Sequence, residues 1–313
     1  MRIEEKCTKF CWSRSVLVAG GSGFLGSNLV KKLAKTHDVL VVDIAQQQNI
    51  MLQRESNVSF IKLDISFFKN LEKLPKVDVV YNLGSPASVL SFNDDNYVSL
   101  SNSTFSSFIS MLNWCKKNGI EKYIFPSSGT VYGSSSNAKN RSLSPITIYG
   151  ALKLTHEALA YLYREDFDVS GLRIFMGYGP GEERKGKIAS PVFQFLSDVI
   201  EGRAPTIWGD GSQTRDLIFI DDVVDVMIHS LHLSGLNFFD VGTGINTSFN
   251  DIIKIISKIT QKKVNVQRVP KPKSYVKDTS ADPKFLKSLI GKNLIGAEEG
   301  ISNFYNYLSR KKY

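Results

Sequence analysis

The side chains best suited to proton chemistry in this sequence are Tyr149 and Lys153, which stand four residues apart at the start of a stretch rich in Ala, Leu, Lys and Glu. In a helix this spacing puts both on one face, so an ammonium lies beside a phenol. A neighbouring cation favours the phenolate, which otherwise forms near pH ~10. The pair is therefore a candidate proton-transfer site, although a solvated lysine beside a half-buried tyrosine has the same spacing.

A glycine-rich loop follows the first apolar run, Ser15–Ala19, and opens a predicted helix, Ser27–Lys35. Glycines recur at every third position from Gly20 to Gly26. They allow a tight turn and the close approach of a diphosphate, while the start of the helix supplies free N–H groups. The next predicted strand, Asp38–Asp43, ends in a carboxylate that accepts hydrogen bonds from an adenosine ribose and repels a 2′-phosphate. The pattern predicts binding of NAD rather than NADP.

Strands and helices alternate through the first half of the chain. The strands are short runs rich in Val, Ile and Leu, which favours a parallel sheet covered on both faces. Right-handed crossovers then give an α/β fold with a doubly wound (Rossmann) parallel sheet. The further predicted strands are Phe60–Leu63, Val77–Leu83, Lys122–Pro126 and Val169–Phe175, and the further predicted helices are Thr104–Asn118 and Ala151–Tyr163.

The composition of the sequence changes after about residue 176, where the predicted loops are longer and charged residues, Pro and Gly are more frequent. We expect an NAD-binding Rossmann domain over residues 1–175 and a smaller C-terminal α/β substrate domain over residues 176–313. Segments near residues 218–244 are expected to return to the first domain. The predicted helices of this part are Pro191–Glu201, Asp221–Leu233, Phe249–Thr260 and Glu298–Leu308.

The composition argues against several classes of protein. The chain has 313 residues, 42% of them hydrophobic and 22% charged, as in a soluble globular protein. The net charge of +9 suits phosphate-bearing substrates, but no concentrated basic stripe with interleaved aromatics predicts a nucleic-acid groove. Cys7, Cys11 and Cys115 are interpreted as free thiols, and no metal site is predicted. No signal peptide or membrane-spanning run is found, so the expected location is the cytoplasm.

Further motifs follow the glycine loop in a fixed order. They are Asp64-Ile65, the segment Asn82 to Ser88, the segment Ser127 to Gly133, the pair Tyr149 and Lys153, the segment Arg173 to Pro180, the segment Gly209 to Asp216 and the segment Asp240 to Gly244. In this order they resemble the nucleotide-sugar epimerase/dehydratase branch of the extended short-chain dehydrogenase/reductase superfamily. The resemblance runs over nearly the whole chain, and it implies an NAD-dependent enzyme that acts on a nucleotide-diphosphate sugar.

The resemblance also implies a role for individual side chains. Tyr149, as phenolate, would take the proton of a sugar hydroxyl while hydride passes to NAD, and Ser128 would hydrogen-bond the same oxygen. Lys153 would lower the pKa of Tyr149 and bind the nicotinamide ribose. The expected NAD contacts are Gly20, Gly23, Phe24, Leu25, Gly26, Asp43, Asp64, Ile65, Leu83, Gly84, Ser85, Tyr149 and Lys153, and the expected substrate contacts are Ser128, Thr130, Met176, Arg215 and Lys271.

The two positions after Ser128 narrow the reaction. Dehydratases and decarboxylases of this family typically carry an acid there, and a dehydratase needs it to protonate the leaving hydroxyl, whereas this chain has Gly129 and Thr130. A 4-epimerase needs only reversible hydride transfer at C4 and a 4-keto intermediate that rotates. The sequence therefore predicts an NAD-dependent nucleotide-sugar 4-epimerase with Tyr149 as acid/base, although the segment Asn82 to Ser88 resembles that of UDP-glucuronate decarboxylases.

Other interpretations remain open at this stage. Within the family they are a nucleotide-sugar dehydratase or decarboxylase and a 4-ketosugar reductase, and outside enzymes a non-catalytic regulator that binds NAD or a nucleotide sugar. Met176 replaces the family's usual Asn, and Lys271, followed by Pro272-Lys273-Ser274, replaces an Arg that binds phosphate. The resemblance also implies a homodimer through the helices Thr104–Asn118 and Ala151–Tyr163.

Overall fold

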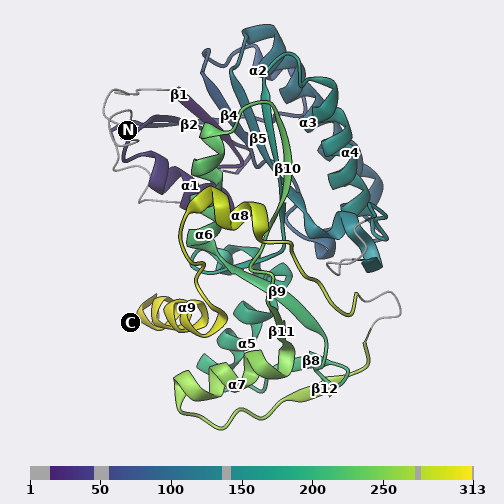
Figure 1. The fold of residues 1–313 in the computed structure, drawn as a ribbon, viewed down its shortest axis with the longest axis vertical. Coiled ribbons are helices and arrows are strands. Elements are labelled where there is room, and N and C mark those ends of the chain that lie inside the picture. Colours follow the sequence, from purple (N-terminus) through teal and green to yellow (C-terminus); the bar gives the residue numbers. More distant parts are fainter. Residues whose placement is uncertain (1–14, 46–55, 136–141, 272–275, 312–313) are drawn as a thin grey trace, which may run out of the picture.

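The apolar runs of the first half of the chain form a seven-stranded sheet in this protein's structure, a computed structural model, with the strand order β10-β6-β5-β4-β1-β2-β3 (Figure 1). The strands are β1 (Ser15–Ala19), β2 (Asp38–Asp43), β3 (Val58–Lys62), β4 (Val79–Asn82), β5 (Lys122–Ser128), β6 (Asp168–Ile174) and β10 (Leu236–Val241). Every neighbouring pair is parallel, so helical crossovers cover both faces. The predicted α/β fold with a doubly wound (Rossmann) sheet is confirmed.

The structure describes residues 15–45, 56–135, 142–271 and 276–311. Predictions that involve Cys7, Cys11 and the segment Pro272-Lys273-Ser274 lie outside the described residues. Cys115 is a buried free thiol. Within the described ranges, no helix has the length and apolar character needed to cross a membrane, and no cluster of three or more His, Cys, Asp or Glu side chains could hold a metal ion.

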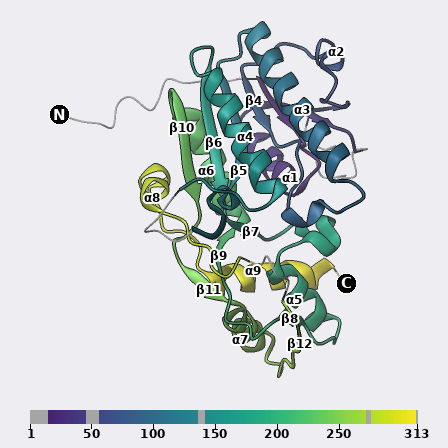
Figure 2. The ribbon, with the colours of Figure 1, turned by 90° about the vertical axis from the view of Figure 1, so that its right-hand side faces the viewer.

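Side chains of each strand alternate between the two faces of the sheet, and each face has its own apolar core. On β1, Val16 and Val18 belong to one core, and Leu17 and Ala19 belong to the other. The first core is covered by α1 (Phe24–Leu33) and α6 (Ile220–His229), and the second by α2 (Phe68–Leu71), α3 (Tyr97–Asn118) and α4 (Ile148–Leu162) (Figures 1 and 2). The continuous apolar character of the strands reflects this burial on both faces.

Most of the remaining chain lies beyond one end of the large sheet (Figures 1 and 2). There β7 follows β6 almost directly and pairs with β9, β9 pairs with β11, and β8 pairs with β12. The elements are β7 (Met176–Tyr178), β8 (Thr206–Trp208), β9 (Thr214–Phe219), β11 (Asn246–Ser248), β12 (Gln267–Val269), α5 (Pro191–Ile200), α7 (Phe249–Thr260), α8 (Lys284–Ile290) and α9 (Ala297–Lys311). Apolar residues of α5, α7 and α9 extend the first core.

Two features differ from the sequence-based expectations. α3 begins at Tyr97 rather than Thr104, because its first turns are rich in Ser and Asn, whose low helix propensity hides the start. Of the segments expected to return to the large sheet, β10 does so beside β6, whereas β9, which contains Ile218, pairs in the smaller sheet. The division into domains 1–175 and 176–313 stays a prediction.

Candidate active site

Three predicted catalytic side chains meet at the carboxyl end of β5. Ser128 is the last residue of β5, and Tyr149 and Lys153 lie on the first two turns of α4. The hydroxyl of Thr147 caps this helix by accepting the N–H of Gly150 (3.1 Å). A hydrogen bond joins the side chains of Ser128 and Tyr149. The strand end and the capped helix therefore hold a serine hydroxyl against the phenol.

Lys153 is buried beneath this pair, with 3% of its surface exposed. Its Nζ donates to Oγ of Ser85 (2.7 Å) and to the carbonyl of Pro126 (3.0 Å). The same Nζ lies 5.5 Å from the centroid of the Tyr149 ring. Burial disfavours the charged form and lowers the pKa of Lys153 to about 7. The lysine can therefore gain or lose a proton near neutral pH.

Burial also acts on Tyr149, and it opposes the sequence-based expectation. Removal of the phenolate from water raises the pKa of Tyr149 to about 12, and the hydrogen bond with Ser128 offsets only part of this. The shift of the Tyr149 pKa in the protein comes from burial and from Ser128, and a lowering of this pKa by Lys153 stays a prediction. The amine has a pKa of about 7 itself, so its charge at neutral pH is incomplete. Within the protein alone, burial therefore favours the neutral phenol over the phenolate.

An ion pair between α4 and β6 lies next to the predicted catalytic residues. Glu157, one helical turn after the catalytic lysine, accepts two hydrogen bonds from Arg173 of β6 (2.9 and 2.7 Å) and one from the Ser127 hydroxyl. Arg173 also donates to the hydroxyl of Tyr132 (2.8 Å), which donates to Asp240 of β10 (2.8 Å). These bonds hold α4 against the ends of three strands. Sequence reasoning missed this role of Glu157, and its spacing on the α4 face was the available signal.

The predicted cofactor loop makes a close contact between two backbones. Gly20 has a φ of +73°, and a Cβ there would lie 2.7 Å from the carbonyl group of Leu83. A Cβ on Gly26 would lie 2.2 Å from the carbonyl oxygen of Gly20, and one on Gly84 would lie 2.9 Å from Cδ1 of Ile65. Only glycine fits at Gly20 and Gly26 without a backbone shift. The contact brings five predicted NAD contacts together.

The start of α1 is free to bind an anion. The helix follows Gly23, which is exposed and provides no capping side chain, and its first turn contains no acidic residue. The N–H groups of Phe24 and Leu25 therefore have no partner within the helix. Beside them, Oγ of Ser22 is buried and has no hydrogen-bond partner in the described chain. A helix N-terminus beside an unpartnered buried hydroxyl fits the diphosphate of NAD.

Two carboxylates stand where the adenosine end of NAD is predicted. Asp43 accepts the N–H of Ser22 (2.9 Å) and the N–H of Ala45 (3.0 Å), which fixes it beside the glycine loop. Asp64 is exposed and accepts from the N–H and the hydroxyl of Ser66 (2.9 and 2.7 Å). Each carboxylate oxygen can accept a second hydrogen bond. The fixed position of Asp43 thus fits recognition of a ribose diol.

Three of the predicted substrate contacts, Thr130, Met176 and Lys271, differ from one another in burial and in hydrogen bonding. The N–H of Thr130 donates to Oγ of Ser128 (3.2 Å), and Oγ1 of Thr130 is buried without a partner among the described residues. Met176 lies on β7 opposite Leu217 of β9 and packs against the first core. Lys271 follows β12 and has an exposed side chain. Of these three residues in the described structure, Thr130 is the one that hydrogen-bonds a predicted catalytic residue.

Arg215, the predicted diphosphate contact, is turned toward backbone. It is 8% exposed and donates to the carbonyls of Thr214 (2.6 Å), Val276 (3.0 Å) and Lys277 (3.1 Å). Its guanidinium carbon lies 5.6 Å from the centroid of the Phe249 ring. These bonds fasten the segment at residue 276 to β9. A diphosphate would share the guanidinium with these carbonyls, so this contact stays a prediction.

The structure gives a steric reason for the missing acid after Ser128. The parallel register of β5 and β6 pairs Ser128 with Ile174, which brings Gly129 beside Phe175. A Cβ on Gly129 would lie 2.9 Å from two atoms of the Phe175 ring and 3.0 Å from a third. Carbon atoms do not approach this closely without repulsion. The aromatic ring therefore occupies the space that an acidic side chain at residue 129 would need.

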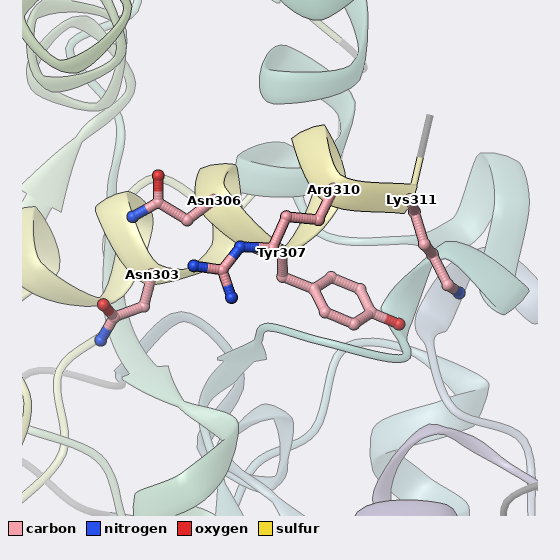
Figure 3. Close-up of a pocket in the computed structure, with 5 residues that line it drawn as sticks. All are labelled: Asn303, Asn306, Tyr307, Arg310 and Lys311. Atoms are coloured by element: carbon pink, nitrogen blue, oxygen red, sulfur yellow. The ribbon is translucent and has the colours of Figure 1, made fainter. Parts of the chain in front are cut away.

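A pocket along α9 lies outside this set of residues (Figure 3). It is lined by Asn303, Asn306, Tyr307, Arg310 and Lys311. The hydroxyl of Tyr307 donates to Glu183 (2.9 Å), and Lys311 forms an ion pair with the same carboxylate. None of the predicted catalytic or cofactor contacts lines this pocket. We therefore build the site on the carboxyl ends of the strands and not on the pocket of α9.

Comparison with known proteins finds similarity to several 4-epimerases of UDP-sugars. The NAD dependent epimerase/dehydratase family matches residues 16–238. The UDP-glucuronate 4-epimerase of Thermodesulfobacterium geofontis is 28% identical over 93% of this chain and 95% of its own. The UDP-glucose 4-epimerase of Thermotoga maritima, solved with UDP-glucose, has a TM-score of 0.87 at 27% identity, with 96% of this chain and 100% of that chain covered. The UDP-glucuronic acid 4-epimerase of Bacillus cereus, solved with UDP-glucuronic acid and NAD, has a TM-score of 0.83 at 26% identity, with 95% and 99% covered.

A double-mutant cycle tests the contact between Gly129 and Phe175. We expect Gly129→Ala to lower the free energy of unfolding by roughly 1–3 kcal/mol, because the added methyl overlaps the ring. In a Phe175→Ala background the same change is expected to be nearly neutral, since the ring is absent. Denaturant unfolding of the four proteins measures the coupling. An equal loss in both backgrounds would show that the ring does not exclude a side chain at residue 129.

The low pKa of Lys153 makes stability depend on pH. Its pKa in the folded protein is about 7 against an ordinary value of 10.5, so the unfolded chain binds more protons between these values. The free energy of unfolding should therefore rise with pH from about 7 toward about 10. We expect this rise in the nucleotide-free wild type and a smaller one in Lys153→Met, measured by denaturant unfolding across this range. Identical slopes in the two proteins would contradict the buried, largely neutral amine.

Proposed function

The chain belongs to the NAD-dependent epimerase/dehydratase family, and we propose that it is a nucleotide-sugar 4-epimerase that works by reversible hydride transfer at C4. The observation that carries the proposal is the hydrogen-bonded pair Ser128 and Tyr149 above buried Lys153, with Gly129 where a dehydratase needs an acid. Its similarity to UDP-sugar 4-epimerases supports the same reaction and a UDP-sugar as substrate.

Tyr149 is the acid/base of the proposed reaction. Its phenolate removes the proton of the sugar C4 hydroxyl, while the Ser128 hydroxyl donates to the same oxygen and fixes its position. When bound, NAD would supply a hydride acceptor for C4 and a positively charged ring that would favour the phenolate. Lys153, with a pKa of about 7, can take up or release a proton as Tyr149 changes its charge. Tyr149 returns the proton to the sugar oxygen in the last step.

Inversion at C4 requires that the 4-keto sugar turn its other face to the same cofactor. A wall with many hydrogen-bonding groups would hold the sugar ring in one orientation. Here Gly129 contributes no side chain, and the Phe175 ring packs against it. The hydroxyl of Thr130 is the one polar group we assign to the sugar on this side, on the basis of its unpartnered Oγ1. The absence of a side chain at residue 129 leaves one hydrogen-bonding group fewer to hold the sugar in a single orientation.

The alternatives predict different products or different cofactor use. Dehydration is disfavoured because the Phe175 ring leaves no space for an acid at residue 129. A 4-ketosugar reductase uses the same three catalytic residues, but it consumes reduced cofactor in proportion to product. A non-catalytic regulator has no need of a tyrosine and a serine in hydrogen-bond contact over a buried lysine. The identity of the product and the amount of reduced cofactor consumed per product formed distinguish these possibilities.

A homodimer through α3 and α4 is part of the proposal. Residues 97–115 of α3 carry no charged side chain, and Val98 and Phe105 are 56% and 42% exposed. On α4, Leu162 is 66% exposed. Water-exposed apolar side chains on an uncharged helix fit contact with a second copy. The molar mass in solution, measured by light scattering, decides between one chain and two.

The proposed function predicts the product of a defined assay. Purified protein incubated with a panel of UDP-sugars should yield a C4 epimer without net consumption of NAD. Tyr149→Phe should lower kcat by about 10²-fold or more, since the acid/base hydroxyl is lost. Tyr161→Phe, on the exposed side of the same helix, is the matched control and should retain activity. A dehydrated product, or stoichiometric oxidation of NADH, would contradict the proposal.

A further inference from the structure

The segment after β7 is fastened to the first turn of the cofactor-binding helix. Nδ2 of Asn28 on α1 donates to the carbonyl of Phe24 (2.9 Å) and to the carbonyl of Pro180 (2.9 Å). Nζ of Lys185 lies 4.3 Å from the centroid of the Phe24 ring. These contacts place the short 3₁₀ helix Glu182–Ile188 beside the glycine loop. A part of the chain assigned to the substrate side thus reaches the N-terminus of α1.

Arg184 of this segment extends over the glycine loop. Its Nη1 donates to the carbonyl of Ser22 (3.0 Å), and its side chain is exposed. The neighbouring charges are paired, because Lys185 contacts Glu182 (3.3 Å) and Glu183 contacts Lys311. In the described parts of the chain, Arg184 forms no ion pair with a carboxylate. Its positive charge therefore lies beside the N-terminus of α1 without a directly paired carboxylate among the described residues, although Asp43 bonds the N–H of the same Ser22.

We propose that Arg184 binds the diphosphate of NAD and closes over it from the C-terminal half of the chain. One guanidinium nitrogen contacts the Ser22 carbonyl, and the remaining donors form a planar fork that matches phosphate oxygens. The adjacent Ser22 Oγ is buried without a partner among the described residues, which independently indicates that a polar ligand completes this loop. The start of α1 adds N–H donors and no acidic residue that would repel the ligand.

A purely structural role does not account for this arginine equally well. An exposed arginine that donates to a single neutral carbonyl contributes little to folding. Asn28 and Lys185 already hold the segment against α1. The positive charge of Arg184 beside the loop would contribute mainly to binding of the diphosphate. The proposal rests on the use of NAD and is independent of which sugar is epimerised.

Binding of NADH to nucleotide-free protein, followed by fluorescence titration without sugar, tests the proposal. We expect Arg184→Ala to weaken binding by about 5- to 30-fold, as for loss of a hydrogen bond to a charged group at a partly exposed site. The NADH affinity of Arg184→Lys should lie between those of the wild type and Arg184→Ala, because lysine retains the positive charge but lacks the planar fork of donors. The affinity of the wild type should fall more steeply with salt than that of Arg184→Ala.

Lys187→Ala is the matched control, since this cation lies in the same segment and is exposed. Its affinity for NADH should equal that of the wild type, and the melting temperature of nucleotide-free Arg184→Ala should also be unchanged. Equal NADH affinities for Arg184→Ala and Lys187→Ala would overturn the proposal. So would a loss of affinity in Arg184→Ala that is accompanied by a lower melting temperature of the nucleotide-free protein. Because no sugar is present, failure of the epimerase assay leaves this test unaffected.

Discussion

The buried ion pair between Glu157 and Arg173 is the interaction on which the catalytic geometry depends. It joins α4 to β6 with two hydrogen bonds, and Ser127 adds the end of β5 to the same carboxylate. Removal of one partner from a buried pair leaves an uncompensated charge, which costs about 3–5 kcal/mol. The pair therefore fixes a helix carrying two of the predicted catalytic residues against the strand end carrying the third. Lys153 adds a hydrogen bond from α4 to the carbonyl of Pro126 on β5, so the helix and the strand end are joined at two places.

Burial is the second constraint, and it acts on the two titrating groups in opposite directions. The same desolvation raises the pKa of Tyr149 to about 12 and lowers the pKa of Lys153 to about 7. Both groups therefore favour their neutral forms in the protein alone. A charged cofactor changes this balance because it brings a positive charge into a site of low polarity. In the proposed reaction, proton transfer by Tyr149 would therefore depend on occupation of the cofactor site.

The sequence predicts the features that depend on local spacing or on strand order. The glycine positions Gly20 and Gly26 need only the geometry of a strand, a turn and a helix, and the pair on α4 needs only a helical repeat. The parallel sheet follows from alternating apolar runs. Contacts between distant segments could not be predicted in this way. They include Phe175 against Gly129 and Arg215 against the carbonyls of Val276 and Lys277, since each depends on the register or path of two separate segments.

The fate of the hydrogen at C4 is the most direct measure of the proposed chemistry. Hydride transfer that returns to the same carbon keeps this hydrogen, whereas proton abstraction at carbon exchanges it with solvent. The measurement is mass spectrometry and NMR of the product formed from a UDP-sugar deuterated at C4. We predict a C4 epimer that retains deuterium at C4. Deuterium lost to solvent, or found at C6 of a dehydrated sugar, would contradict the account.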